Sequence, residues 1–263
     1  MTAAAEETRP RMGETTPVAG APAAFRVAAE FAIGGDLRFL SHHDELRLLA
    51  RALIRARWPV AYSHGFNPLP RLVVPLPRSL GITADSHWAL ADLREPRPAV
   101  ELFDSLAAVL PESYRLLRVV APLSRVMPHA LGVTYEIELE QHAAEQIAPS
   151  LERLTDGSPL VVQRDGGPHK PTRMIDIQPY IEEVELNGCV LRLRLRIENQ
   201  RTARPSEILE EIGLAAQAYN HRLRRADVQW DIEFAGPTLG PVTHERKRIG
   251  KEDDNEGQDQ DRS

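Results

Sequence analysis

The order in which strand-like and helix-like segments follow one another constrains the fold of this chain more than any other feature of its sequence. Residues 25–121 alternate between apolar or alternating runs typical of strands and amphipathic runs typical of helices. Strands are expected at 25–33, 71–76, 86–93 and 114–121, and helices at 44–57 and 98–110. This β-α-β-β-α-β order predicts a split βαβ, or ferredoxin-like, unit.

A similar order recurs after residues 122–132, a segment rich in proline that we interpret as a linker. Strands are expected at 133–140, 160–163, 173–186, 189–197 and 227–234, and helices at 142–154 and 205–218. Asn187-Gly188 lies between two alternating runs, which is a strong signal for a hairpin. The sequence therefore predicts an α+β protein with two tandem ferredoxin-like units, at 25–121 and 133–235.

The two ends of the chain differ from this pattern. Residues 1–24 carry acids, prolines and alanines without an apolar signal core, and we expect a disordered leader. Residues 236–263 form a polar tail whose last part, 250–263, has six acids and two bases and is also expected to be disordered. Because the sequence contains no apolar run long enough to span a bilayer, we expect no contact with a membrane.

The number and spacing of the cysteine and histidine residues limit which disulfides, clusters and metal sites the chain can form. Cys189 is the single cysteine, so no internal disulfide can form and a reducing, cytoplasmic location is expected. One thiolate cannot hold an iron–sulfur cluster, which normally takes three or four. The nine histidines are scattered without metal-ligand spacing, so we expect no metal and no cofactor.

The helix predicted after Ser41 is unusually basic on one side. Ser41 is a suitable N-cap, and Asp44 lies at the capping-box position in the first turn, where negative charge suits the helix dipole. The apolar stripe consists of Leu46, Leu49, Ala50 and Leu53, and Pro59 is expected to end the helix.

Arg47, Arg51 and Arg55 follow one another at intervals of four on a different face of this helix. Three guanidiniums in one row repel each other unless an anion lies beside them. Between Asp36 and Arg78 there are seven arginines against three acids, in a chain whose formal net charge is −6. A basic patch on an acidic protein favours a phosphate-bearing partner, although a solvated helix face explains any single arginine equally well.

The segment after the helix combines aromatic rings with polar side chains. Gly65, Pro68 and Pro70 favour turns, whereas Tyr62 and Phe66 offer aromatic faces. Recognition of single-stranded RNA uses this combination of stacking faces, polar edges and guanidiniums. The competing interpretation for Phe66 is a side chain that fills the core. The predicted RNA-binding residues are Arg38, His42, Arg47, Arg51, Arg55, Tyr62, Ser63, His64, Phe66, Asn67 and Arg71.

These segments resemble the radical SAM-linked protein family, whose members are encoded beside, or fused to, cobalamin-binding radical SAM proteins. The resemblance covers residues 25–235 and is dense over 31–80. Its motifs here are Phe31, Gly34, Arg38-Phe39-Leu40-Ser41-His42, Asp44, Tyr62-Ser63, Gly65-Phe66-Asn67-Pro68, Pro70 and Ile175-Asp176-Ile177-Gln178-Pro179. Leu69 and Gln178 depart from the family pattern, in which His and Arg are frequent at these positions.

The resemblance implies a radical SAM protein as the partner. Asp176, in the second motif, is a candidate to pair with an arginine of the basic helix. The predicted function is a non-catalytic accessory protein that binds RNA, such as tRNA or rRNA, and presents it for modification. Two alternatives stay open. One is a metal-independent endoribonuclease that uses His42, His43 and Arg38, and the other is a protein-interaction scaffold without nucleic acid.

Overall fold

The computed structural model describes residues 25–123, 126–165, 171–234 and 238–239. Five α-helices lie within these residues: α1 (His42–Arg55), α2 (Ala99–Ala107), α3 (Gln141–Thr155), α4 (Pro205–Glu211) and α5 (Ala216–Tyr219). The strands are β1 (Phe25–Ile33), β2 (Leu72–Val73), β3 (Thr83–Leu93), β4 (Tyr114–Leu123), β5 (Ala130–Glu138), β6 (Val161–Arg164), β7 (Arg173–Asp176), β8 (Ile181–Asn187), β9 (Val190–Arg196), β10 (Arg224–Trp230) and β11 (Thr238–Leu239). Three short 3-10 helices complete the fold: η1 (Gly35–Phe39), η2 (Gln178–Tyr180) and η3 (Asn220–Arg222).

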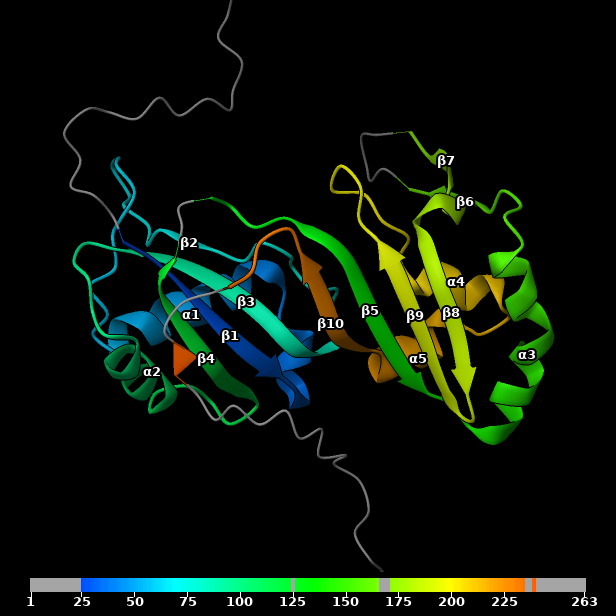
Figure 1. The fold of residues 1–263 in the computed structure, drawn as a ribbon, viewed down its shortest axis with the longest axis horizontal. Coiled ribbons are helices and arrows are strands. Elements are labelled where there is room, and N and C mark those ends of the chain that lie inside the picture. The colour runs from blue at the N-terminus through cyan, green and yellow to red at the C-terminus, as the bar shows by residue number, and fades with distance from the viewer. Residues whose placement is uncertain (1–24, 124–125, 166–170, 235–237, 240–263) are drawn as a thin grey trace, which may run out of the picture.

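One mixed sheet of nine strands runs through the molecule (Figure 1). Its order is β11-β4-β1-β3-β10-β5-β9-β8, and β2 pairs with β3 off this path. Neighbouring strands are antiparallel except β3 and β10, which are parallel and join the two halves of the sheet. Strands β6 and β7 form a separate two-stranded sheet. The protein is therefore of mixed α and β structure, as predicted, and its two halves share a continuous sheet.

The helices and the strands enclose two main cores. In the first half, α1 and α2 lie behind β1, β3 and β4 in the view of Figure 1 and bury residues such as Phe31, Leu49 and Leu106. In the second half, α3 and α4 cover the inner faces of β5 and β9, where Ile147, Ile208 and the leucines of β9 are buried. A smaller cluster on the opposite face of the first half includes Trp88 and Phe234, whose rings stack at 3.8 Å.

Two expected elements are interrupted. The strand expected at 173–186 divides into β7 and β8, because the Asp176 carboxylate accepts a hydrogen bond from the Gln178 backbone N–H at 3.1 Å and Pro179 has no N–H to offer a ladder. The helix expected at 205–218 divides into α4 and α5. Gly213 adopts φ +86, and Leu214 N–H donates to the Leu209 carbonyl, which is the hydrogen bond that closes a Schellman motif.

Other boundaries also differ from the expected ones. Strand β4 extends to Leu123 and β5 begins at Ala130, so both strands enter the range predicted as a linker. The predicted disordered segments 1–24 and 250–263 lie outside the described residues. Among the described residues, no helix is long and apolar enough to cross a membrane.

Candidate nucleic-acid interface

The first turn of α1 is capped as the sequence predicted. The Ser41 hydroxyl accepts a hydrogen bond from the Asp44 backbone N–H at 3.2 Å, and the same hydroxyl donates to the Asp44 carboxylate at 2.7 Å. This hydroxyl, together with Arg47, lowers the pKa of Asp44. The acid is therefore ionised at neutral pH and faces the positive end of the helix dipole.

The arginine row of α1 is exposed to solvent along its whole length. Arg47 lies 3.2 Å from the Asp44 carboxylate, and the Arg51 Nε donates to the Arg47 carbonyl at 3.2 Å. Arg55, one turn further on, has no hydrogen bond or ion pair with any residue in the described part of the chain. The row thus leaves most of its hydrogen-bonding capacity to solvent or to a ligand.

The end of α1 adds a further arginine. The helix ends at Arg55, four residues before Pro59, because Ala56, Arg57 and Trp58 form a Schellman motif in which Trp58 N–H donates to the Leu53 carbonyl at 3.0 Å. Arg57 occupies the position at which glycine is favoured, with φ +58. Its side chain is exposed. An arginine at a position that favours glycine raises the backbone energy, and its exposed guanidinium is available to a ligand.

Residues 62–71 form an exposed loop that projects at the upper left of Figure 1. Its base is closed by a bridge between Tyr62 and Pro70 and by two bonds between Ser63 and Leu69: Ser63 N–H to the Leu69 carbonyl at 2.8 Å, and Leu69 N–H to the Ser63 hydroxyl at 3.0 Å. Gly65, at φ +134, supplies a turn that other residues rarely adopt. The loop is therefore held at its base while its tip is free.

Phe66 occupies the tip of this loop and is 106% exposed. The interpretation of Phe66 as a side chain that fills the core is therefore wrong. Leu69 is 68% exposed and Tyr62 is 41% exposed on the same loop. His64, Asn67 and Arg71 are also exposed. The Phe66 ring at the tip, with Tyr62 and Leu69 nearer the base, is therefore available for contact with a partner.

The charge that remains on this surface is positive. Of the seven arginines between Asp36 and Arg78, five are exposed, namely Arg47, Arg51, Arg55, Arg57 and Arg71. Of the three acids, Glu45 is buried, which leaves two exposed aspartates. We use the name α1–loop surface for these five arginines together with residues 62–70.

Two predicted binding residues lie at the opposite end of α1 from Arg55. Arg38 is half-buried in η1, where its guanidinium donates to the His221 carbonyl at 3.1 Å and lies 4.9 Å from the Phe39 ring. His42 is half-buried at the start of α1. Because α1 has 14 residues, these side chains are separated from Arg55 by about 20 Å of helix. The predicted site therefore divides into a junction part and the α1–loop surface.

Asp176 does not pair with an arginine of α1. Its carboxylate accepts hydrogen bonds from the Leu160 backbone N–H at 2.9 Å and from Gln178 N–H, and it holds the turn between β7 and η2. The Asp-x-Gln-Pro spacing explains this outcome, because aspartate readily bonds the backbone two residues on. The expected pairing is thus replaced by a structural role in the second half.

A buried ionic network beneath α1 was not predicted from the sequence. Glu45 is 1% exposed and accepts a hydrogen bond from the Tyr114 hydroxyl at 3.0 Å. His87 Nε2 lies 3.0 Å from the same carboxylate, and Arg78 Nε lies 3.8 Å away. On its other side, His87 Nδ1 faces the Arg225 guanidinium at 2.5 Å. The available signal was the helical phase of Glu45, which precedes Leu49 and Leu53 by four and eight residues on the buried stripe.

The network joins the two halves of the molecule. Burial and charge within it also determine the protonation states of its titratable side chains. Arg225 reaches from β10 to donate to the Leu76 carbonyl, and Arg78 donates to the carbonyls of Leu37 and Arg38. Burial lowers the pKa of His87 to about 4, so the ring is neutral at pH 7. Burial opposes ionisation of Glu45, but His87, Arg78 and Tyr114 outweigh it and hold the pKa of this carboxyl below its usual value. Burial and Glu45 raise the pKa of Tyr114 well above its usual value.

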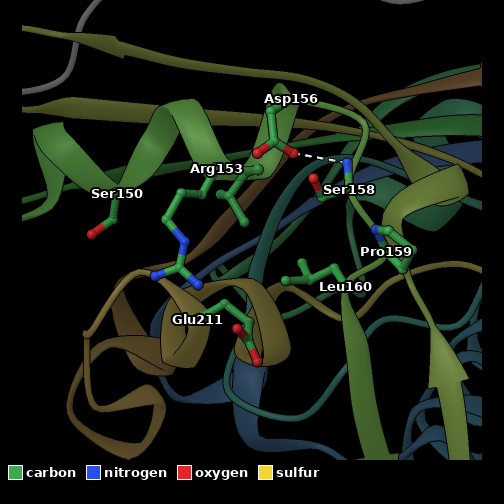
Figure 2. A pocket seen from close by; sticks show the side chains of 8 residues that line it. Ser150, Arg153, Asp156, Ser158, Pro159, Leu160 and Glu211 are labelled. Carbon is green, nitrogen blue, oxygen red and sulfur yellow. Dashed lines mark hydrogen bonds between the residues drawn. The ribbon is translucent and has the colours of Figure 1, made fainter.

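A concave surface lies in the second half of the molecule. A hollow of about 250 Å³ lies between the end of α3, the following loop and α4, and Figure 2 shows its lining side chains. Arg153 is accompanied there by two acids, Asp156 and Glu211, and Asp156 accepts from Ser158 N–H at 2.8 Å. None of the predicted RNA-binding residues lines this hollow. Within the described ranges, no cluster of three or more His, Cys, Asp or Glu side chains is arranged to hold a metal.

Comparison with known proteins assigns a family without an activity. A family model described as "Uncharacterized protein conserved in bacteria (DUF2344)" matches residues 26–205. This span contains all predicted site residues, from Arg38 to Asp176, and the description refers to no radical SAM protein. No curated protein matches the chain.

Proposed function

The chain belongs to the bacterial family DUF2344, whose description states no function, and from this premise we propose that it is an accessory protein that binds single-stranded RNA through the α1–loop surface. The observation that carries the proposal is the complete exposure of Phe66 at the tip of a closed loop, which follows the exposed arginines of α1 in the chain. Single-stranded RNA offers unstacked bases to an aromatic face and phosphates to guanidiniums.

The proposed roles follow from position. Phe66 and Tyr62 stack on bases, and His64 and Asn67 offer hydrogen bonds to base edges. Arg55, Arg57 and Arg71 bind phosphates, since all three are exposed and none has an acidic partner in the described part of the chain. Arg47 and Arg51 extend this track along α1. Arg47 exchanges its exposed Asp44 partner for phosphate, and an exposed pair of this kind contributes little to stability.

The fold supports this assignment by analogy. We infer that each half is a ferredoxin-like unit. In the first half, the antiparallel order β4-β1-β3-β2 agrees with this plan, and in the second half so does β10-β5-β9-β8. The proposed domains are 25–121 and 133–235. Paired units of this type occur in proteins that bind RNA, which is an analogy at the level of the fold only.

The radical SAM partner is a separate part of the proposal. It rests on the resemblance alone, whose densest motifs are Arg38–His42 and Tyr62–Pro70. In this proposal the chain holds the RNA, whereas the partner supplies the modification chemistry. Affinity purification of the native protein, followed by identification of the bound proteins and sequencing of the bound RNA, tests both associations. Recovery of RNA without a radical SAM protein would remove this partner and retain the RNA.

The direct test is a binding titration over a series of salt concentrations. The probe is a fluorescein-labelled single-stranded RNA of about twelve nucleotides, a length that suits one binding groove. Each phosphate contact on a single strand contributes about 0.7 to the slope of log K against log salt. We expect Arg55→Ala to reduce this slope by about that amount and to lower the affinity.

The matched control is Arg153→Ala. Arg153 is an exposed arginine on α3, in the other half of the molecule, and makes no ion pair within the described residues. Its loss should leave the slope unchanged. If wild type, Arg55→Ala and Arg153→Ala have equal affinities and slopes, the α1–loop surface does not bind RNA. The exposed Phe66 would then favour the protein-interaction scaffold.

A further inference from the structure

A second group of exposed arginines lies in the second half of the molecule. Arg173 is on β7, and Arg201 and Arg204 are in the connection between β9 and α4. All three side chains are exposed, and none makes an ion pair with a residue in the described part of the chain. Their positive charge is therefore available to an anionic partner.

Arg164 on β6 holds together the segments that carry these arginines. Its guanidinium donates to the two carboxylate oxygens of Glu207, at 2.6 and 2.7 Å, and to the Thr202 carbonyl at 2.8 Å. The same carboxylate accepts a hydrogen bond from the Arg204 backbone N–H at 2.9 Å. Arg173 lies directly opposite Arg164 in the β6–β7 pair, where Cβ atoms are about 4.5–5.5 Å apart. The Arg164–Glu207 pair therefore fixes β7 against the β9–α4 connection.

A tight turn presents Arg201 at the start of this connection. Glu198 and Arg201 exchange two backbone hydrogen bonds, at 2.9 and 2.8 Å. The two residues between them, Asn199 and Gln200, adopt φ of +49 and +61, which is typical of a type I′ turn. Both amide side chains are exposed. The turn therefore places two exposed amides beside Arg201, immediately before the carbonyl that Arg164 binds.

The acids of these segments do not neutralise the three arginines. Glu198 lies 3.5 Å from Arg196. Asp176, at the other end of β7, is three residues and about 10 Å along the strand from Arg173. Asp165, which follows β6, is the remaining exposed acid in the described ranges 161–165, 173–176 and 198–204. Positive charge is therefore in excess at the end of β7 that carries Arg173.

Both groups of arginines lie at the same end of the shared sheet. Strands β3 and β10 are parallel, and β9 runs in the same direction because β5 is antiparallel to both β10 and β9. The base of the 62–71 loop is bound to the last residues of β3, where Asp92 N–H donates to the Arg71 carbonyl at 3.0 Å. The connection that carries Arg201 follows the last residue of β9, and both segments project toward the top of Figure 1.

The separation of the two groups suits an extended ligand. Three strand spacings, or at least about 14 Å, separate β3 from β9 in the sheet. A small anion such as free phosphate is too short to contact both groups. A single strand of RNA carries phosphates at regular intervals along a flexible backbone, so one strand is able to follow both groups along this end of the sheet.

We propose that Arg173, Arg201 and Arg204 form a second phosphate-binding surface, and that one single-stranded RNA extends from it to the α1–loop surface. We use the name β7–α4 surface for these three arginines together with Asn199 and Gln200. The proposal rests on the RNA binding proposed above and specifies that the ligand contacts both halves of the molecule. The two amides offer hydrogen bonds to base edges.

The test is a salt series of binding titrations on the full chain, measured by fluorescence anisotropy. The probe is a labelled single-stranded RNA of about 30 nucleotides, longer than the roughly 4–16 that one binding groove covers. The double variant Arg173→Ala/Arg201→Ala removes two phosphate contacts. Its slope of log K against log salt should therefore fall by about 1.4, and its affinity by about tenfold at about 0.1 M salt.

The controls separate this effect from a loss of folding or of general charge. Both substituted side chains are exposed and unpaired in the described part of the chain, and substitutions at such positions seldom disturb a fold. Circular dichroism and urea unfolding of the double variant verify this. Arg153→Ala removes another exposed arginine of the second half, on α3, and should bind as wild type does.

Arg55→Ala, alone and added to the double variant, distinguishes the two surfaces. If one RNA contacts both, the losses of slope add to about 2.1 in the triple variant. If Arg55→Ala lowers the slope while the double variant matches Arg153→Ala, the β7–α4 surface is overturned and the RNA binding proposed above remains. The exposed arginines would then suit an acidic protein. If only the double variant loses slope, a strand that spans both halves is overturned together with the α1–loop surface.

Discussion

Phe66 shows how a single residue can be assigned a role by its surroundings. An apolar ring in a loop rich in proline and glycine fits both a buried plug and an exposed contact. In the structure, the base of the loop is closed and the Phe66 ring is exposed to solvent rather than buried. The free energy that a buried phenylalanine contributes to folding is therefore absent at this position.

We predict that Phe66→Ala leaves the free energy of unfolding within about 0.5 kcal/mol of wild type, as for other exposed substitutions. The same variant should lose about 1–3 kcal/mol of RNA-binding free energy if the ring stacks on a base. Urea unfolding and anisotropy on the same preparation measure both quantities. A loss of stability with unchanged binding would contradict the assignment.

Whether His42 or His43 acts as a general base distinguishes a nuclease from a protein that only binds RNA. Their rings lie 5.9 Å apart at the start of α1, and His42 is half-buried. We expect the purified protein to leave candidate RNAs intact, with or without divalent metal. A general base would contribute about 10²–10⁴-fold to a cleavage rate. Site-specific cleavage of a tRNA or rRNA fragment that His42→Ala or His43→Ala abolishes would promote the endoribonuclease alternative.

At the scale of the element, the two sides of α1 differ in burial and charge. One side inserts Glu45, Leu49 and Leu53 into the interior, and the other presents the arginine row. The helix ends in a Schellman motif with Arg57 at the glycine position, so the side chain that we propose for phosphate binding has a backbone cost.

We predict that Arg57→Gly increases the free energy of unfolding by about 0.5–1 kcal/mol, because glycine adopts this conformation without the steric cost of a side chain. The same change should reduce the salt slope of RNA binding by about 0.7, since one phosphate contact is lost. A destabilised variant would mean that the Arg57 side chain holds the end of the helix, which would remove it from the binding surface.

At the scale of the whole molecule, the buried network connects the two halves and makes stability depend on pH. His87 has a pKa of about 4 in the folded chain, compared with an ordinary value of 6.5. A histidine with a depressed pKa stabilises the fold above its unfolded pKa, and this contribution is lost as the pH falls toward the folded pKa. The lowered pKa of Glu45 acts in the same direction at more acidic pH.

We therefore predict that the free energy of unfolding falls between about pH 6.5 and pH 4, by up to about 1.4 kcal/mol per pH unit for one proton. His87→Gln retains a donor and an acceptor but does not titrate, so its stability should vary less over this range. Urea unfolding at several pH values measures both proteins. Parallel pH profiles for wild type and His87→Gln would exclude His87 as the titrating group.

The sequence alone was sufficient for features that depend on neighbouring residues. The Ser41 cap, the hairpin at Asn187-Gly188 and the mixture of strands and helices follow from local hydrogen bonding and from hydrophobic periodicity. The exposed arginine row also follows from the helical repeat. Boundaries were less predictable, because the Schellman motifs at Arg57 and Gly213 and the turn at Asp176 depend on backbone conformations that side-chain periodicity does not encode.

Only the tertiary structure decided which charged side chains are paired inside the protein and which remain exposed to solvent. Arg38 and Arg71 both lie near turns. The Arg38 guanidinium donates to the His221 carbonyl in the second half of the molecule, whereas Arg71 is exposed to solvent. Glu45 has the sequence context of a helix-dipole partner, but His87, Tyr114 and Arg78 converge on it from segments more than 30 residues away. The parallel pairing of β3 with β10 brings Arg225 to this cluster, and such long-range pairing depends on how whole surfaces pack rather than on local pattern.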